Sequence, residues 1–202
     1  MTEVSRRSFL KAGAVVTAGA FFIPNLLSCS PGNKLNIAIV GAGGRGADNW
    51  HALFADSPED ANKPKDQRKK VLTENVVAIC DVDDRRAAEA FKTFPKAKRY
   101  KDFRKMLDEM GNQIDAIMVS TPDHTHFAAA MAAMQLGKHV YVEKPLAHNV
   151  WQLRTLKKAA KHYGIVSQMG NQGHTTNGIR LIREWYEADV LGQVKEVHAW
   201  FG

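Results

Sequence analysis

The chain has 202 residues, a formal net charge of +7 and two cysteines. Two cysteines exclude a disulfide-stapled scaffold, even for an exported protein. Part of the positive charge lies in residues 63–70, KPKDQRKK, which contain no interleaved aromatic residue and no nucleic-acid-binding motif. We therefore expect a solvated loop there and no nucleic-acid partner.

The first 28 residues have the pattern of an export signal. Arg6 and Arg7 precede an apolar stretch and resemble a twin-arginine signal, so the expected partner is the twin-arginine export machinery, which moves folded proteins. The apolar stretch at residues 12–27 contains two glycines and a proline, and it is short for a permanent membrane span. The sequence therefore predicts a periplasmic protein.

The end of this segment, LLSC, resembles a lipobox, in which the cysteine is acylated after cleavage. A lipid on Cys29 would anchor the mature chain, with residues 29–34 as a short polar tether. The alternatives are an uncleaved N-terminal anchor and a plain signal with a nearby cut. Membrane contact is expected only through the signal or the lipid.

Downstream, apolar runs alternate with helical patterns. The expected strands are residues 35–40, 75–80, 114–120, 139–143 and 165–169. The expected helices are residues 45–55, 84–94 with Asp84 as cap, 102–110, 123–136, 149–163 and 175–188, and a charged surface insertion is expected at 57–73. This alternation predicts an α/β fold with a doubly wound parallel sheet, a Rossmann dinucleotide-binding domain over residues 35–190.

The end of the chain predicts the start of another domain. Residues 193–201, QVKEVHAWF, alternate in polarity and predict one strand. A lone first strand would expose its edge, so we expect residues 191–202 to begin a truncated α+β substrate domain of a longer protein. Trp185, Tyr186 and Trp200 are expected in a core.

The motif GAGGRG lies between the first expected strand and helix. Gly41 permits a tight turn, Gly43 lets a pyrophosphate approach the backbone, and Gly46 lets the helix pack close to the sheet. The helix N-terminus then offers free N–H groups to the anion. Gly44 belongs to the same candidate cofactor site, and Arg45 either adds a phosphate contact or is solvated.

Asp81 ends the second expected strand, where an acidic residue accepts hydrogen bonds from the adenosine ribose hydroxyls. Its distance from the glycine motif is longer than usual, because the insertion intervenes. Its carboxylate would repel a 2′-phosphate, so NAD is the expected cofactor, while Arg85 or Arg86 leaves NADP open. The alternative role for Asp81 and Asp83 is helix capping.

Four motifs together resemble a known family. GAGGRG, STPDHTH, GKHVYVEKPLA and QMGNQGH lie in residues 35–202 and resemble the Gfo/Idh/MocA oxidoreductases. The resemblance implies an NAD(P)-dependent enzyme with a Rossmann domain, a sheet-rich substrate domain and a small-molecule carbohydrate substrate. It also implies a homo-oligomer when the chain is full length.

The resemblance implies roles for several residues at the strand ends. Lys144, in EKP, is implied to lie near the nicotinamide and the reacting hydroxyl as the catalytic group. A lysine beside a cationic nicotinamide is destabilised as a cation, which favours proton transfer near neutral pH; the alternative is a surface charge at a turn. Glu143 either orients Lys144 or contacts the cofactor. The residues implied at the nicotinamide are Ser120, Thr121 and Pro122, with His124 at a ribose.

Two further polar clusters contain side chains that could bind a ligand. His124 and His126 lack the additional ligands of a closed metal site, so no metal is predicted and His126 is expected to be packed or hydrogen-bonded. Gly170, Asn171 and Gln172 follow the last expected strand at the same crevice. Their amides are expected either to bind sugar hydroxyls or to close a turn, and Asn171 is counted among the candidate cofactor-binding residues.

The sequence therefore predicts an NAD(P)-dependent oxidoreductase that moves a hydride from a hydroxyl-bearing carbon of a sugar, polyol or glycoside to nicotinamide. One alternative is an NAD-dependent glycoside hydrolase or lyase that oxidises the sugar transiently, which would suit an exported protein with trapped NAD. Another is a non-catalytic NAD-binding fragment.

Overall fold

The computed structural model describes residues 34–200. The predicted export signal, Cys29 and Phe201 lie outside the described residues. Within the part of the chain that is described, no helix is both long enough and apolar enough to cross a membrane.

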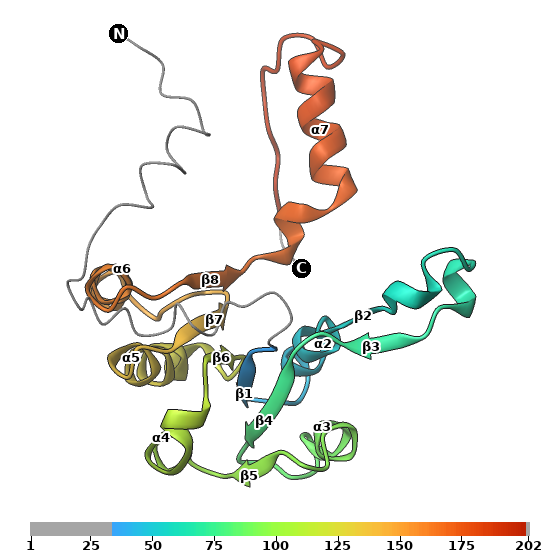
Figure 1. Ribbon diagram of the computed structural model, residues 1–202. Helices are drawn as coiled ribbons and strands as arrows, with labels where there is room; N and C mark the ends of the chain where they lie inside the picture. Colours follow the sequence, from blue (N-terminus) through green and yellow to red (C-terminus); the bar gives the residue numbers. More distant parts are fainter. Residues whose placement is uncertain (1–33, 201–202) are drawn as a thin grey trace, which may run out of the picture. The chain divides into compact units, whose positions relative to one another are not determined.

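The core of the fold is a parallel sheet of six strands (Figure 1). Its order is β5 (Lys98–Tyr100), β4 (Asn75–Cys80), β1 (Asn36–Val40), β6 (Ala116–Val119), β7 (His139–Glu143) and β8 (Ser167–Gly170). Every neighbouring pair is parallel, so the predicted doubly wound sheet is confirmed. The sequence did not predict β5, because its three residues, KRY, contain no apolar run and form a strand only by pairing with the edge of β4.

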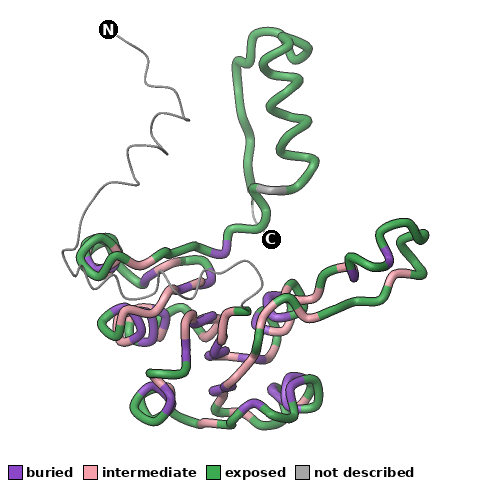
Figure 2. Tube along the Cα trace, in the orientation of Figure 1, coloured by how far each residue is buried: buried purple, intermediate pink, exposed green. Residues whose placement is uncertain are grey.

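Helices cover both faces of this sheet (Figure 1). Ile37 and Ile39 of β1 pack with α2 (Arg45–His51) and α3 (Ala88–Thr93). Ala38 and Val40 point to the other face and pack with α4 (Phe103–Met110), α5 (His126–Gln135) and α6 (Val150–His162). Figure 2 shows buried residues along the central strands and on the inner sides of these helices. Burial on both faces explains why the strands are apolar runs rather than alternating patterns.

Two helices begin at side-chain caps where the sequence predicts a helix to begin. A third helix begins later than predicted. Asp102 accepts a hydrogen bond from the Arg104 amide at 2.9 Å, and Asn149 accepts one from the Gln152 amide at 2.9 Å. The helix predicted from Asp84 begins only at Ala88, so Asp84 as its cap is wrong. The Asp84 carboxylate instead pairs with Lys101.

The insertion is a small hairpin, and it shortens the helix predicted over residues 45–55. That helix, α2, ends at His51, because β2 (Phe54–Asp56) pairs antiparallel with β3 (Lys70–Leu72). Two short 3₁₀ helices, η1 (Pro58–Asp60) and η2 (Lys65–Gln67), connect the two strands. Asp60 is buried and accepts a hydrogen bond from the Lys69 amide at 2.8 Å, which connects the two halves of the hairpin.

After β8 the chain forms η5 (Gln172–Thr175) and α7 (Asn177–Glu187). The strand predicted at residues 193–201 is wrong over its described part, since residues 193–200 form no strand. Trp185, Tyr186 and Trp200 are 46%, 65% and 82% exposed, so their prediction as core residues is also wrong. Neither a partner strand nor a second core covers these residues within the described chain. The remaining 3₁₀ helices are η3 (Gly111–Gln113) and η4 (Asp123–Thr125).

The strand order places a crevice between β1 and β6. From β1 the chain builds the sheet outward through β4 and β5, and from β6 it builds outward in the other direction through β7 and β8. In open α/β sheets, ligands bind beyond the carboxyl ends of the strands where the order reverses. The Val40–Gly41 and Val119–Ser120 strand ends meet at this point.

Gly46 sets how closely α2 approaches the first strand end. A Cβ at Gly46 would lie 2.0 Å from the Gly41 carbonyl oxygen, a backbone atom that cannot rotate away. Gly178 also occupies the second position of a helix, α7, but a Cβ there would meet nothing within 4 Å. The two glycines therefore share the same position in a helix but differ in the space around them, so they can be compared directly.

We predict that Gly46→Ala lowers the free energy of unfolding of the full-length protein by about 2 kcal/mol or more, because α2 must move off the sheet. Gly178→Ala should be neutral or slightly stabilising, since alanine favours a helix over glycine by about 1 kcal/mol. Urea denaturation measures both. Equal effects of the two substitutions would contradict the close contact at Gly46.

Candidate functional site

A cavity of about 830 Å³ opens at the carboxyl edge of the sheet, at the β1–β6 crevice. Its walls come from the loops that follow four strands. The lining residues are Val40, Gly41, Gly43, Arg45, Cys80, Asp81, Val82, Asp83, Arg86, Lys101, Asp102, Phe103, Arg104, Ser120, Thr121, Pro122, His124 and Thr125. The fold thus brings the glycine motif, the acidic strand end and the STPDHT stretch to one site.

The glycine motif forms a turn that only glycine can make without strain. Gly41 has φ +83° and Gly44 has φ +54°. A Cβ at Gly41 would lie 2.7 Å from the Ser120 carbonyl oxygen, so the first loop closes directly against the loop after β6. A Cβ at Gly43 would lie 2.8 Å from the Cβ of Arg86. In this structure, Arg86 is therefore the residue that lies too close to Gly43 for any larger side chain there.

Asp81 joins the end of β4 to the glycine motif. Its Oδ2 accepts a hydrogen bond from the Ala42 amide at 2.8 Å, and its Oδ1 accepts one from the Asp83 amide at 2.9 Å. Each carboxylate oxygen has two lone pairs, so Asp81 retains acceptor capacity toward the cavity. The site therefore fits a ribose beside a glycine-bound pyrophosphate, and Asp81 also orients the loop that would bind them.

The turn after Asp81 is closed by Asp83. Its Oδ1 accepts hydrogen bonds from the amides of Arg85 at 2.9 Å and Arg86 at 3.4 Å. These contacts, the Arg85 amide first, hold the pKa of Asp83 below its usual value. Asp83 therefore closes a turn and does not cap a helix, because α3 begins only at Ala88 and has no side-chain cap. Asp81 instead faces the glycine motif.

The stretch after β6 forms the opposite wall of the cavity. The Ser120 hydroxyl accepts a hydrogen bond from the Asn49 amide at 2.9 Å, which connects this wall to α2. Thr121 and Thr125 share a hydroxyl hydrogen bond of 2.6 Å. Pro122 and His124 lie on the cavity lining beside them.

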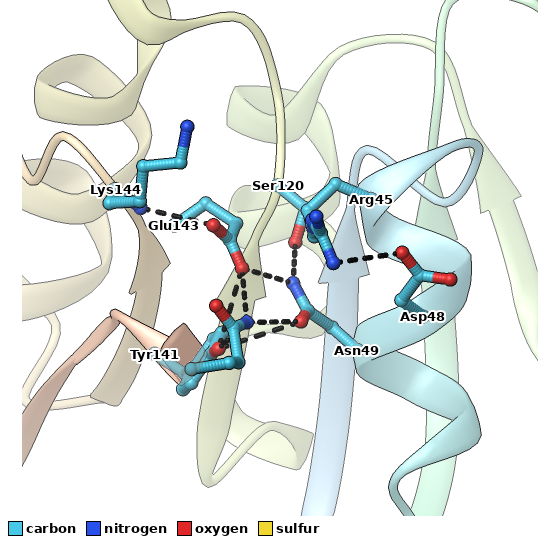
Figure 3. A network of polar contacts seen from close by, with 8 residues as sticks. Arg45, Asp48, Asn49, Ser120, Tyr141, Glu143 and Lys144 are labelled. Atoms are coloured by element: carbon cyan, nitrogen blue, oxygen red, sulfur yellow. Dashed lines mark hydrogen bonds and ion pairs between the residues drawn. The ribbon is translucent and has the colours of Figure 1, made fainter. Parts of the chain in front are cut away.

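A network of polar side chains surrounds the Glu143 carboxylate (Figure 3). Glu143 is only 3% exposed, and its Oε1 accepts hydrogen bonds from Asn49 at 3.0 Å and from Gln172 at 2.6 Å. Tyr141 donates to the same oxygen at 3.4 Å, and the Lys144 amide donates to Oε2 at 3.2 Å. Glu143 therefore contacts the backbone of Lys144, and its two predicted roles, orienting Lys144 or contacting the cofactor, both stay predictions.

These contacts keep the buried carboxylate ionised. Burial by itself would raise the pKa of Glu143, but hydrogen bonds from Gln172, Asn49 and the Lys144 amide outweigh burial and lower it. The charge of Arg45 lowers it further. Burial and the adjacent carboxylate raise the pKa of Tyr141, so its hydroxyl keeps its proton and can donate. Gly170 leaves room for the network, because a Cβ there would lie 2.6 Å from Glu143 Oε1.

Five predicted site residues lie outside the cavity lining: Gly44, Gly46, Glu143, Lys144 and Asn171. Lys144 is exposed and sits beside the Glu143 network, one strand further along the sheet edge. Asn171 is exposed and precedes η5, and its amide bonds to the Met169 carbonyl, which is a turn contact. Gly44 and Gly46 shape the glycine turn but do not line the cavity.

Sequence reasoning missed Asn49 and Tyr141. Asn49 is 7% exposed and lies one helical turn after Gly46, on the side of α2 that packs against the sheet. A polar residue one helical turn after Gly46 was the signal in the sequence that could have indicated this position. Tyr141 lies two residues before Glu143 on β7, so both side chains point to the same face. The shared face of Tyr141 and Glu143 was visible in the sequence, but their hydrogen-bond partners on α2 and η5 were not.

The described residues offer no support for a metal site or for a cysteine nucleophile. Residues 34–200 contain no cluster of three or more His, Cys, Asp or Glu side chains able to hold a metal ion. Cys80 lines the cavity, but burial, with smaller contributions from Asp102 and Asp81, raises the pKa of its thiol to about 12. The thiol is therefore protonated near neutral pH and is a poor nucleophile.

Comparison with known proteins identifies the family. Residues 35–171 match the model of the Gfo/Idh/MocA oxidoreductase family, with its NAD-binding Rossmann fold. The chain belongs to this family. A second match, to the TAT (twin-arginine translocation) pathway signal sequence, covers residues 3–22 and confirms the predicted signal for export out of the cytoplasm.

The relatives of this chain include proteins named as a dehydrogenase and as a glycosyl hydrolase. Levoglucosan dehydrogenase of Pseudarthrobacter phenanthrenivorans is 27% identical over 80% of this chain and 39% of its own length. Glycosyl hydrolase family 109 protein 1 of Shewanella sp. strain ANA-3 is 25% identical over 98% of this chain and 47% of its own length. The chain thus spans less than half the length of these curated relatives.

A solved structure of similar fold is the myo-inositol 2-dehydrogenase from Lactobacillus plantarum. It superposes with a TM-score of 0.63, covers 80% of this chain and 43% of its own, and is 23% identical. The similarity confirms the fold of this Gfo/Idh/MocA family member.

We predict that Glu143→Gln destabilises the full-length protein by about 1–3 kcal/mol at pH 7. In either orientation, the new amide directs an N–H group at the donor of Asn49, Gln172 or Lys144. Because the folded pKa of Glu143 lies below its ordinary value of 4.5, the wild type keeps this contribution above that value and loses it as pH falls through the folded pKa.

Chemical denaturation at pH 7 and at descending acidic pH tests this prediction. The difference between wild type and Glu143→Gln should shrink as the solution becomes acidic. Glu184→Gln, at an exposed position of α7, is the matched control and should change stability by less than about 0.5 kcal/mol. A pH-independent difference for Glu143→Gln would argue against an ionised buried carboxylate.

Proposed function

We propose that the full-length protein is an NAD-dependent oxidoreductase acting on a hydroxyl of a sugar, polyol or glycoside. The observation that carries the proposal is the cavity at the β1–β6 switch point. It gathers the glycine motif, Asp81 and the Ser120–Thr121–Pro122 stretch in a member of an NAD-binding family. The name of the levoglucosan dehydrogenase relative supports a carbohydrate substrate.

The proposed roles follow from the side chains at this edge. The glycine motif, with Arg45 at its end, binds the pyrophosphate, and Asp81 accepts hydrogen bonds from ribose hydroxyls. A carboxylate at that place disfavours a 2′-phosphate, so NAD is preferred over NADP, although Arg86 lies within the same cavity. Ser120, Thr121, Pro122 and His124 form the wall on the nicotinamide and ribose side.

Lys144 is the proposed catalytic residue. Oxidation of the hydroxyl-bearing carbon removes one hydride and one proton; bound NAD supplies the hydride acceptor, and Lys144 takes the proton. Its backbone is held by Glu143 while its side chain is exposed at the sheet edge, where a substrate can reach it. General acid–base catalysis of this kind contributes a factor of about 10²–10⁴.

We further propose that the protein works in the periplasm, with a lipid on Cys29, and that it assembles as a homo-oligomer. NAD is a cytosolic cofactor, so the protein would bind it before export. The twin-arginine signal supports this order, because the corresponding machinery moves proteins that are already folded.

A second candidate function is NAD-dependent glycoside cleavage, in which the sugar is oxidised transiently and re-reduced. The specific observation in its favour is the glycosyl hydrolase family 109 relative, whose similarity extends over 98% of this chain. In this reaction the hydride returns to the sugar, so glycoside is consumed without net NADH.

One assay separates the two functions. The full-length protein is incubated with NAD and a panel of sugars, polyols and aryl glycosides, and both NADH absorbance and released aglycone are followed. Net NADH supports the dehydrogenase, and aglycone release without NADH supports glycoside cleavage. If NAD binds in calorimetry but no substrate turns over, the catalytic proposal fails.

We predict that Lys144→Met lowers kcat by a factor of about 10²–10⁴, while the Kd for NAD changes much less. Lys157→Met, at an exposed position of α6, is the matched control and should leave kcat unchanged. Steady-state kinetics and calorimetry provide the two values. An unchanged kcat in Lys144→Met would remove Lys144 from the mechanism.

A further inference from the structure

Asn49 lies between two polar groups at the edge of the sheet (Figure 3). It is 7% exposed, and its Nδ2 atom lies 3.0 Å from Glu143 Oε1 and 2.9 Å from the Ser120 hydroxyl oxygen. Glu143 is buried, whereas Ser120 lines the cavity proposed for the cofactor. One side-chain amide therefore connects a buried carboxylate to a hydroxyl in the wall of the site.

The contacts on both sides of Asn49 fix which way its amide points. Although burial raises the pKa of Glu143, the hydrogen bonds from Gln172 and Asn49 lower it below its usual value, so the carboxylate is ionised and only accepts. On the other side, the Gln172 amide donates to Asn49 Oδ1 at 3.0 Å. The reverse orientation of Asn49 would place oxygen against oxygen at Glu143 and nitrogen against nitrogen at Gln172.

This orientation decides what the Ser120 hydroxyl does. The NH₂ group of an amide only donates, so the Ser120 oxygen is the acceptor in its contact with Asn49. A hydroxyl also carries one proton that it can donate. Within residues 34–200, no acceptor receives a hydrogen bond from the Ser120 hydroxyl, whose one side-chain contact is the one with Asn49. Because Ser120 lines the cavity, its proton is available to a bound ligand.

Ser120 also lies against the glycine motif. A Cβ at Gly41 would lie 2.7 Å from the Ser120 carbonyl oxygen, and a Cβ at Gly46 would lie 3.4 Å from the Ser120 Cβ. The glycine motif is the part of the site proposed to bind the pyrophosphate. NAD presents phosphate, ribose and carboxamide oxygens, all of which accept hydrogen bonds, so the cofactor has the complementary chemistry for a donor at Ser120.

We propose that the Ser120 hydroxyl donates a hydrogen bond to an acceptor oxygen of bound NAD, and that Asn49 is the positioning residue that gives the hydroxyl this direction. This role rests on the proposed binding of NAD in the cavity, and it does not depend on the catalytic role of Lys144. The direction originates at Glu143. Its carboxylate requires a donor from Asn49, the same NH₂ group donates to Ser120, and the proton of Ser120 is left for the ligand.

Calorimetry of the full-length protein with NAD and with ADP-ribose tests the donor. Ser120→Ala should raise the Kd for NAD by about 3–10-fold, the usual effect of one lost hydrogen bond. Ser167→Ala, at the exposed first residue of β8, is the matched control and should leave the Kd unchanged.

The two ligands locate the accepting oxygen. Equal weakening of NAD and ADP-ribose by Ser120→Ala would place this oxygen in the ADP-ribose part, and weakening of NAD alone would place it on the nicotinamide carboxamide. Either result supports a donor at Ser120. An unchanged Kd for both ligands would overturn it.

Asn49→Asp tests the direction of the hydroxyl. The new carboxyl group has an oxygen in the place of Nδ2, and any proton that it shares with Glu143 lies between those two groups. The Ser120 hydroxyl then donates to the new carboxyl group instead of to NAD. Ser120→Ala should therefore raise the Kd by about 3–10-fold in the wild-type background and have little effect in the Asn49→Asp background.

This double-mutant comparison separates positioning from structural support. A residue that only holds α2 against the sheet would change stability, but it would leave the effect of Ser120→Ala the same in both backgrounds. Equal effects would therefore overturn the positioning role of Asn49. Asn112→Asp, at an exposed position of η3 before β6, is the matched control and should preserve the full effect of Ser120→Ala.

Two further measurements complete the test. If Asn49→Asp does not fold, Asn49→Leu takes its place: the hydroxyl then has no fixed direction, so the effect of Ser120→Ala should be smaller than in the wild type. If the wild type binds neither NAD nor ADP-ribose, the proposed function fails at its cofactor, and this role of Ser120 fails with it. If the wild type binds NAD but Ser120→Ala changes nothing, only the role of Ser120 is wrong.

Discussion

The close contact between the ends of β1 and β6 is the constraint on which the rest of the site depends. The Ser120 amide donates to the Val40 carbonyl at 2.8 Å, and a Cβ at Gly41 would lie 2.7 Å from the Ser120 carbonyl oxygen. Because the sheet order reverses here, the chain leaves these two strands in opposite directions, and a cavity opens above them. The glycine motif lets the loops meet without closing that cavity.

A second constraint is the buried charge of Glu143. An isolated carboxylate in this position would be costly, and the amides of Asn49 and Gln172 compensate for it. These two side chains come from α2, after β1, and from η5, after β8, so one carboxylate joins segments from the two ends of the described chain's sheet-forming part. The same carboxylate contacts the Lys144 backbone, which links the stability of the edge to the proposed chemistry.

The site therefore has one side that is enclosed by loops and one side that is exposed. The glycine motif, Asp81 and the loop after β6 enclose the region proposed for the cofactor, and many of their polar groups are already paired with one another. Lys144 lies at the exposed side, where the described residues provide few groups that would select a substrate. Both reactions proposed above begin with a hydride transfer to bound NAD, so one arrangement of residues would serve either of them.

The sequence alone determined the parallel sheet, the glycine turn and the position of Asp81, because buried strands and tight turns leave local patterns in residue type. It also predicted the GAGGRG, STPDHTH and EKP loops at one edge. It did not determine where α2 ends, that β5 exists, or that Trp185 and Trp200 are exposed. Only the tertiary structure brought Asn49, Gln172 and Glu143 together, and only it placed both nitrogens of His126 against carbonyl oxygens. Such contacts depend on the packing of segments far apart in the chain, and periodicity along the sequence carries no information about them.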